Sequence, residues 1–149
     1  MFSDISKDEI VRYFKGGLDC SQVVLMQWAE ELGYEREEAA RMAAAFGGGM
    51  FRGDTCGAVS GALLAIGLKY GHCELGDAEG KAKLMEKTAE FQRKFTERCG
   101  STICRELVGF DFAKDGELGR AMASGKLFEF CPCAVADALE ILDEIMADE

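Results

Sequence analysis

The sequence predicts an all-α protein, and three observations lead to that class. The chain has 149 residues with a single proline, Pro132, and helix-forming residues dominate the rest. Alternating apolar and polar stretches, which are typical of half-buried strands, are nearly absent. Most glycines fall between helix-like segments, where glycine caps or ends a helix. We therefore expect a single domain over residues 1–149, built as a compact bundle of about six helices with a Gly-rich interhelical loop.

Cap residues and apolar spacing define the first three predicted helices. Residues 6–9, Ser-Lys-Asp-Glu, fit a capping box, and the helix that they open ends at Gly16-Gly17. A second helix covers about residues 19–32. A third helix covers about residues 35–46, because glutamates in its first turn suit the positive end of the helix dipole. The glycines at 47–49 end this third helix and start the Gly-rich loop.

The fourth predicted helix opens near Asp54-Thr55-Cys56 and runs to Tyr70. Its first half contains Gly57 and Gly61, which are four residues apart and therefore share a face. Glycine inside a helix costs roughly 1 kcal/mol relative to alanine. We expect both glycines to face the crowded interior, where another backbone or a bulky cofactor lies against them.

The fifth helix is the longest and covers about residues 77–99. Residues 101–127 indicate a short turn followed by a loop, with at most a short helix around residues 117–123. The last helix starts at Cys131-Pro132, because proline prefers the first position of a helix.

Composition and charge exclude several classes of function. The formal net charge is −10, which makes nucleic acids and anionic membranes poor partners. No apolar run reaches the roughly 18 residues that a membrane-spanning helix needs, so we expect no membrane insertion. The N-terminal residues 1–9 are acidic and polar, without the basic and apolar regions of a secretory signal. These features predict a cytoplasmic protein.

Seven cysteines and a single histidine, His72, are the unusual part of the composition. An odd number of cysteines excludes a fully paired intramolecular disulfide framework, and a cytoplasmic compartment keeps most thiols reduced. Four of the cysteines lie at or near predicted helix N-termini, where backbone N–H groups and the helix dipole stabilise a thiolate. These four candidates are Cys20, Cys56, Cys104 and Cys131.

The four candidate cysteines support more than one chemical interpretation. If they converge on one site, four thiolates can bind an iron–sulfur cluster or a tetrahedral zinc ion. Their spacing matches no common zinc-ribbon or ferredoxin pattern, so scattered core thiols are the alternative. Cys56 and Cys131 are also candidates for a metal-free redox pair. The remaining cysteines have no assigned role; Cys99 continues an apolar stripe, and Cys133 should point away from Cys131. These remaining cysteines are Cys73, Cys99 and Cys133.

The Gly-rich loop at residues 47–53 directly precedes Cys56. It is either a plain helix–helix linker or a backbone wrapped closely around a cofactor or anion, with Arg52 as a possible counter-charge. A helix N-terminus and a nearby cation both lower a thiol pKa. We therefore expect Cys56 to be the most acidic of the seven thiols.

These residues resemble the redox-active protein family named for its C_GCAxxG_C_C cysteine pattern, and the resemblance spans nearly the whole chain. Residues 20–25 (CSQVVL), 46–61 (FGGGMFRGDTCGAVSG), 104–109 (CRELVG) and 131–132 (CP) are similar to its four cysteine blocks. The resemblance implies that Cys20, Cys56, Cys104 and Cys131 are the hallmark cysteines of a small helical redox protein with a metal or iron–sulfur centre. The chain departs from the family name at residues 55–58, where Thr-Cys-Gly-Ala replaces Gly-Cys-Ala.

The leading hypothesis is electron transfer or redox sensing through an iron–sulfur cluster or a thiolate-bound iron or zinc ion. Its expected partner is a redox protein, and a homo-oligomer is compatible with the sequence. One alternative is a metal-free thiol–disulfide oxidoreductase. The other is a helical scaffold or partner-binding protein whose buried thiols are inert.

Overall fold

The computed structural model describes residues 4–147, so the first three residues of the acidic N-terminus lie outside it. The all-α prediction is confirmed, because the described residues form helices and no strand. Eight α-helices replace the expected six, since the segment after residue 100 contributes two short helices of its own. Within residues 4–147, no helix combines the length and apolar character needed to cross a membrane. The helices are α1 (Lys7–Lys15), α2 (Cys20–Ala29), α3 (Arg36–Ala43), α4 (Gly57–Tyr70), α5 (Ala78–Cys99), α6 (Cys104–Val108), α7 (Glu117–Ser124) and α8 (Lys126–Met146).

The predicted start of the last helix at Cys131-Pro132 is wrong. Helix α8 begins at Lys126 and contains Pro132 in its second turn. Gly125, with a φ of 75°, ends α7 and immediately precedes α8, so one left-handed residue separates the two helices. Pro132 has no N–H to donate to the carbonyl oxygen of Phe128, so α8 runs through the proline with the loss of one backbone hydrogen bond. Cys131 therefore lies inside a helix and not at its N-terminus.

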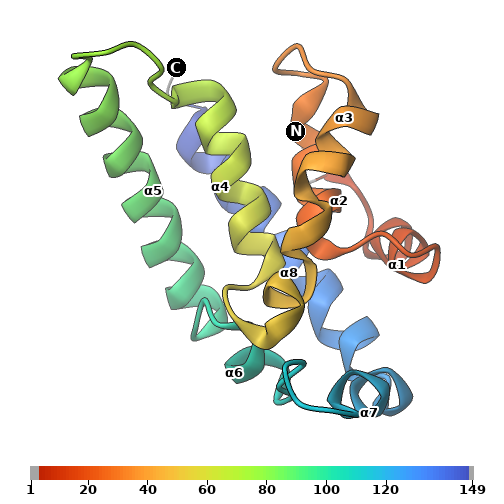
Figure 1. Ribbon diagram of the computed structural model, residues 1–149. Coiled ribbons are helices and arrows are strands. Elements are labelled where there is room, and N and C mark those ends of the chain that lie inside the picture. The colour runs from red at the N-terminus through yellow and green to blue at the C-terminus, as the bar shows by residue number, and fades with distance from the viewer. Residues whose placement is uncertain (1–3, 148–149) are drawn as a thin grey trace.

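Helices α2, α4 and α8 form the centre of the bundle. Helix α2 is buried on nearly all sides, from Ser21 to Ala29, and it packs against α3, α4 and α8. Helix α5 lies alongside α4 and contacts α8, while α1 and α7 pack on α8 (Figure 1). The short helix α6 and the turn that precedes α4 meet at the end of the bundle where α7 also lies (Figure 1). This end of the molecule contains the site described below.

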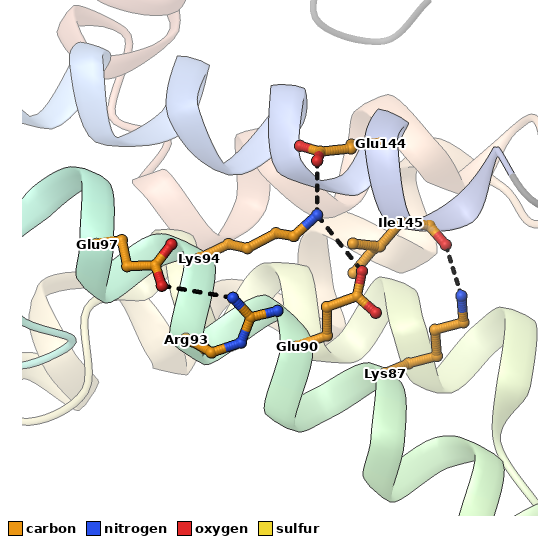
Figure 2. Close-up of polar contacts among 7 residues, drawn as sticks. All are labelled: Lys87, Glu90, Arg93, Lys94, Glu97, Glu144 and Ile145. Carbon is orange, nitrogen blue, oxygen red and sulfur yellow. Dashed lines mark hydrogen bonds and ion pairs between the residues drawn. The ribbon is translucent and has the colours of Figure 1, made fainter.

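Polar side chains of α5 hold the C-terminal part of α8 in place (Figure 2). The buried Lys87 donates a hydrogen bond of 2.8 Å from Nζ to the carbonyl oxygen of Ile145. This contact satisfies one of the carbonyl groups left unpaired at a helix C-terminus. Lys94 Nζ lies 2.6 Å from Glu144 and 3.5 Å from Glu90, and this pairing raises the pKa of Lys94.

The expectation that Gly57 and Gly61 face the interior is confirmed, since both are buried where α4 crosses α2. A Cβ atom at Gly61 would lie 2.6 Å from the carbonyl oxygen of Ser21, which is backbone and has no freedom to rotate away. A Cβ atom at Gly57 would overlap the sulfur of Cys20. The two glycines therefore set how closely α2 and α4 approach.

We predict that Gly61→Ala lowers the free energy of unfolding by about 1–3 kcal/mol, because the added methyl overpacks the α2–α4 contact. Gly67→Ala is the matched control on the same helix, since a Cβ atom there meets nothing within 4 Å. That control should stabilise the protein by up to about 1 kcal/mol through helix propensity. Urea denaturation followed by circular dichroism measures both; equal effects of the two substitutions would contradict the close approach.

Candidate functional site

All four candidate cysteines line a single cavity of about 340 Å³. The cavity lies at the end of the bundle where the starts of α2 and α4 meet α6, α7 and the first turns of α8 (Figure 1). Sulfurs from four different helices, far apart in the sequence, thus face one space. Cys56 and Cys104 are buried, whereas Cys20 and Cys131 are partly exposed to the cavity.

Helix N-termini place three of the four cysteines, as the sequence predicted. Cys20 is the first residue of α2, Cys104 is the first residue of α6, and Cys56 immediately precedes α4. Cys131 reaches the cavity from within α8 instead. The N-terminus of α2 is further fixed by Asp19, whose N–H donates to Gln22 Oε1 at 2.9 Å.

Two backbone hydrogen bonds join the segments that contain Cys56 and Cys104. Cys56 donates its N–H to the carbonyl oxygen of Thr102 at 2.7 Å, and Cys104 donates its N–H to the carbonyl oxygen of Asp54 at 2.6 Å. Together they form an isolated antiparallel bridge between Thr55 and Ile103. This bridge holds the start of α6 against the start of α4, although the two lie almost fifty residues apart.

The sulfurs of Cys20 and Cys56 form a side-chain hydrogen bond, which dominates the electrostatics of the site. This bond lowers the pKa of Cys20 below the ordinary thiol value, and backbone N–H groups of Gly48 and Ser21 act in the same direction. Burial and the carboxylate of Asp19 oppose them, but the net shift is downward. The same bond, with burial, raises the pKa of Cys56 well above its ordinary value. Cys56 is therefore the S–H donor, and Cys20 is the thiol that ionises first.

The expectation that Cys56 is the most acidic thiol is wrong, because the hydrogen bond with Cys20, then burial and the charge of Cys20, raise its pKa and outweigh the helix N-terminus. The backbone N–H of Ala58 in the first turn of α4 lowers the pKa of Cys56, but by less than the interaction with Cys20 and burial raise it. The other two thiols of the cavity also stay protonated. Burial, followed by the charge of Cys20, raises the pKa of Cys104 to about 12 and raises the pKa of Cys131 further.

The Gly-rich loop wraps around Cys20 and is more ordered than a plain linker. Residues 48–51 all have positive φ, between 57° and 63°, and so form a left-handed turn that includes the non-glycine residues Met50 and Phe51. This turn aims the N–H of Gly48 at the sulfur of Cys20. Arg52 does not serve as the counter-charge proposed from the sequence; it is largely exposed, and its Nε lies 3.8 Å from Asp54 Oδ2.

The other three cysteines lie outside the cavity. Cys73 is exposed in the loop between α4 and α5. Cys99 donates its S–H to Asp137 Oδ2 at 3.5 Å, and burial together with that carboxylate raises its pKa to about 12. Cys133 donates to the carbonyl oxygen of Glu129 at 3.5 Å and so lies on a different side of α8 from Cys131, as expected.

The chemistry of four thiols suits iron or zinc, but their arrangement does not fit a metal ion as it stands. Among residues 4–147, no group of three or more cysteine, histidine, aspartate or glutamate side chains is placed to hold one. The contacts instead single out Cys20 and Cys56 as a bonded pair, with Cys104 and Cys131 on the cavity wall.

The apolar wall of the cavity was missed by the sequence analysis. Several of its side chains come from residues 107–130, a region that the sequence indicated was mostly loop. The signal was present, because this region contains aromatic and aliphatic residues without the spacing of a long helix. The wall residues from this region are Leu107, Val108, Phe112, Leu118, Met122, Leu127, Phe128 and Phe130.

The fold and the site define a small helical protein whose cysteines gather in one cavity, with one thiol activated by another. The sequence matches the family described as "Putative redox-active protein (C_GCAxxG_C_C)" over residues 18–145, and the chain belongs to that family. The matched range contains all four cavity cysteines. No curated protein and no solved structure matches the chain.

We predict that Cys20 is alkylated by iodoacetamide before Cys104 or Cys131, because only a thiolate reacts and Cys20 ionises at the lowest pH. Cys56→Ala removes the S–H donor, so the pKa of Cys20 should rise and its labelling at neutral pH should slow several-fold. Mass-spectrometric mapping over pH 6–10 measures each site.

Cys99→Ala is the matched control, since Cys99 bonds Asp137 outside the cavity and should leave the labelling of Cys20 unchanged. A labelling midpoint of Cys20 that does not move in Cys56→Ala would contradict the sulfur–sulfur hydrogen bond.

Proposed function

We propose that this protein is a thiol-based redox protein in which Cys20 and Cys56 interconvert between a dithiol and a disulfide. One observation carries the proposal: the sulfur of Cys20 lies against Gly57, the residue next to Cys56, in the cavity that both thiols line, and the pKa of Cys20 is lowered while that of Cys56 is raised. A pair with opposite pKa shifts has one group ready to attack and one ready to supply a proton. Membership of the family supports a redox role.

The pair divides the work of thiol–disulfide exchange. The Cys20 thiolate attacks a disulfide of the oxidised partner, forms a mixed disulfide and releases one partner sulfur as a thiolate. Cys56 then loses its proton to that leaving group and attacks the sulfur of Cys20. The second partner sulfur leaves as a thiolate, which takes a proton from solvent. The partner gains two electrons and the protein retains a Cys20–Cys56 disulfide. The same steps in reverse reduce this disulfide and oxidise the partner. The expected partner is a redox protein or a small oxidant.

The high pKa values of Cys104 and Cys131 give these residues a different part. As neutral thiols they line the cavity without adding charge beside Cys20. Two thiolates in one apolar cavity repel each other, and the charge of Cys20 raises the pKa of both Cys104 and Cys131 in this way. In this proposal they are positioning and lining residues, and the two-electron chemistry belongs to Cys20 and Cys56.

A four-thiolate iron–sulfur or metal centre is the second candidate function, and the convergence of all four cysteines on one cavity favours it. Among residues 4–147 no group of three or more possible ligand side chains is placed to hold a metal ion, so such a centre requires the four cysteines to rearrange. It also requires Cys56, Cys104 and Cys131 to lose protons that their raised pKa values retain. Metal binding would therefore release protons in proportion to the thiols that it engages.

We predict that mild oxidation of the metal-free protein forms a Cys20–Cys56 disulfide before any other. Peptide mapping after trapping of free thiols identifies the bond, and Cys20→Ala or Cys56→Ala should abolish it. Cys99→Ala is the control that should leave it intact. Formation of a different first disulfide, such as Cys56–Cys131, would contradict the assignment of the pair.

The same protein purified without oxygen separates the two candidate functions. A four-thiolate centre predicts stoichiometric iron or zinc, with sulfide and visible absorbance for an iron–sulfur cluster, and loss of metal in Cys104→Ala and Cys131→Ala. The dithiol function predicts protein without stoichiometric metal, in which those two variants still form the Cys20–Cys56 disulfide. Stoichiometric metal bound by all four cysteines would replace the dithiol proposal by the metal centre.

A further inference from the structure

The rim of the cavity presents apolar side chains to solvent. Phe51, Leu118 and Met122 line the cavity, yet they remain 55%, 50% and 49% exposed. Phe51 belongs to the left-handed turn before α4, and the other two belong to α7. Exposed apolar side chains that gather around one opening are typical of a ligand site.

The charge of the cavity restricts what can enter it. No lysine, arginine or histidine is among the described residues that line it. Besides the Cys20 thiolate, the acidic side chain that lines it is Asp19, whose carboxyl has a pKa raised by burial. An anionic ligand would lose its hydration in this apolar site without gaining a counter-charge. Phosphate-containing cofactors and carboxylate-containing disulfides therefore fit this cavity poorly.

The size of the cavity restricts the ligand further. A volume of about 340 Å³ lies at the lower end of the range of roughly 300–1,000 Å³ that is usual for small-molecule sites. Phe112 and Phe128 contribute aromatic rings to its wall, and rings of this kind stack on flat aromatic ligands. The occupant that fits is a small, flat, uncharged molecule.

We propose that the cavity binds an uncharged quinone and that the Cys20–Cys56 dithiol reduces it. This inference rests on the dithiol function proposed above and names its oxidant. A dithiol gives up two electrons when it becomes a disulfide, and a quinone is an uncharged aromatic ring that accepts two electrons and two protons. Because the thiol pair lies on the wall of the apolar cavity, a quinone bound there would lie next to the dithiol.

The reaction balances with the groups at hand. The Cys20 thiolate adds to a carbon of the quinone ring and forms a C–S bond, and a proton from solvent neutralises one ring oxygen. The proton of Cys56 passes to the other ring oxygen. The Cys56 sulfur then attacks the Cys20 sulfur, an S–S bond forms, and the C–S bond breaks with its electron pair passing to the ring. The products are the Cys20–Cys56 disulfide and the hydroquinone.

The test compares 1,4-naphthoquinone with its 2-sulfonate, which has the same ring and one negative charge. Reduced protein with the exposed Cys73 replaced by alanine is mixed anaerobically with each quinone. Hydroquinone formation is followed by absorbance, and the disulfide by peptide mapping. Each rate is divided by the rate of the same quinone with the uncharged thiol N-acetylcysteine amide, which removes differences in intrinsic reactivity. We expect the uncharged quinone to react at least about tenfold faster than the sulfonate on this scale, because the cavity offers no counter-charge.

A charge at the rim tests whether the preference arises in this cavity. Leu118→Arg should raise the rate of the sulfonate relative to that of the uncharged quinone by about fivefold, the effect of one solvent-exposed ion pair. Leu75→Arg is the matched control, since Leu75 is fully exposed in the loop between α4 and α5 at the other end of the bundle (Figure 1). It should change neither rate. Equal scaled rates for the two quinones, or equal effects of the two arginines, would overturn the inference.

Diamide, a general thiol oxidant, separates failure of this inference from failure of the proposed function. If diamide forms the Cys20–Cys56 disulfide and neither quinone does, the dithiol function stands and the quinone assignment is wrong. If neither diamide nor quinone forms that disulfide, both proposals fall.

Discussion

The close approach of α2 to α4 is the constraint on which the site depends. The sulfur of Cys20 lies where a side chain at Gly57 would otherwise be, and one turn later the carbonyl of Ser21 lies against Gly61. Without these glycines the two helices would separate by the width of a methyl group, and the sulfurs of Cys20 and Cys56 would lose their contact. The cost of glycine inside a helix, roughly 1 kcal/mol each, is thus offset by a packing arrangement that also creates the thiol pair.

The four cysteines of the cavity have the same side chain but different pKa values, because their surroundings in the cavity differ. In water all four cysteines would have the same pKa, near 8.5. Within the cavity, burial disfavours every thiolate, and the charge on the first thiol to ionise disfavours ionisation of the others. Cys20 is that first thiol because it alone receives both an S–H bond from Cys56 and backbone N–H bonds from Gly48 and Ser21. These three donors stabilise a negative charge on Cys20, and this sulfur therefore acts as the nucleophile.

The sequence predicted what depends on local chemistry and failed where distant segments decide. Caps and glycines located most helices, and helix starts correctly identified Cys20, Cys56 and Cys104. Pro132 misled because proline is most favourable at the first position of a helix, whereas α8 begins at Lys126 and includes Pro132 in its second turn. The acidity of Cys56 was mispredicted because its partner lies thirty-six residues away, at the start of another helix. The expected gathering of the four cysteines rested on their shared helix-start placement and on family resemblance, since spacing alone cannot show that helix ends meet.

The left-handed turn at residues 48–51 contributes to the site in two ways, through a backbone N–H beside Cys20 and through a side chain at the cavity rim. Each non-glycine residue in this conformation costs about 1–2 kcal/mol, so Met50 and Phe51 are unfavourable where glycine would serve the backbone better. Gly48 and Gly49 occupy the neighbouring positions without that cost. The turn aims the N–H of Gly48 at Cys20 on its inner side, while Phe51 forms part of the cavity rim. Glycine at position 51 would relieve the strain but remove one aromatic ring from the cavity rim. Strain at Phe51 is therefore accepted where a side chain lines the cavity, whereas nothing in the structure explains the strain at Met50, which does not line it.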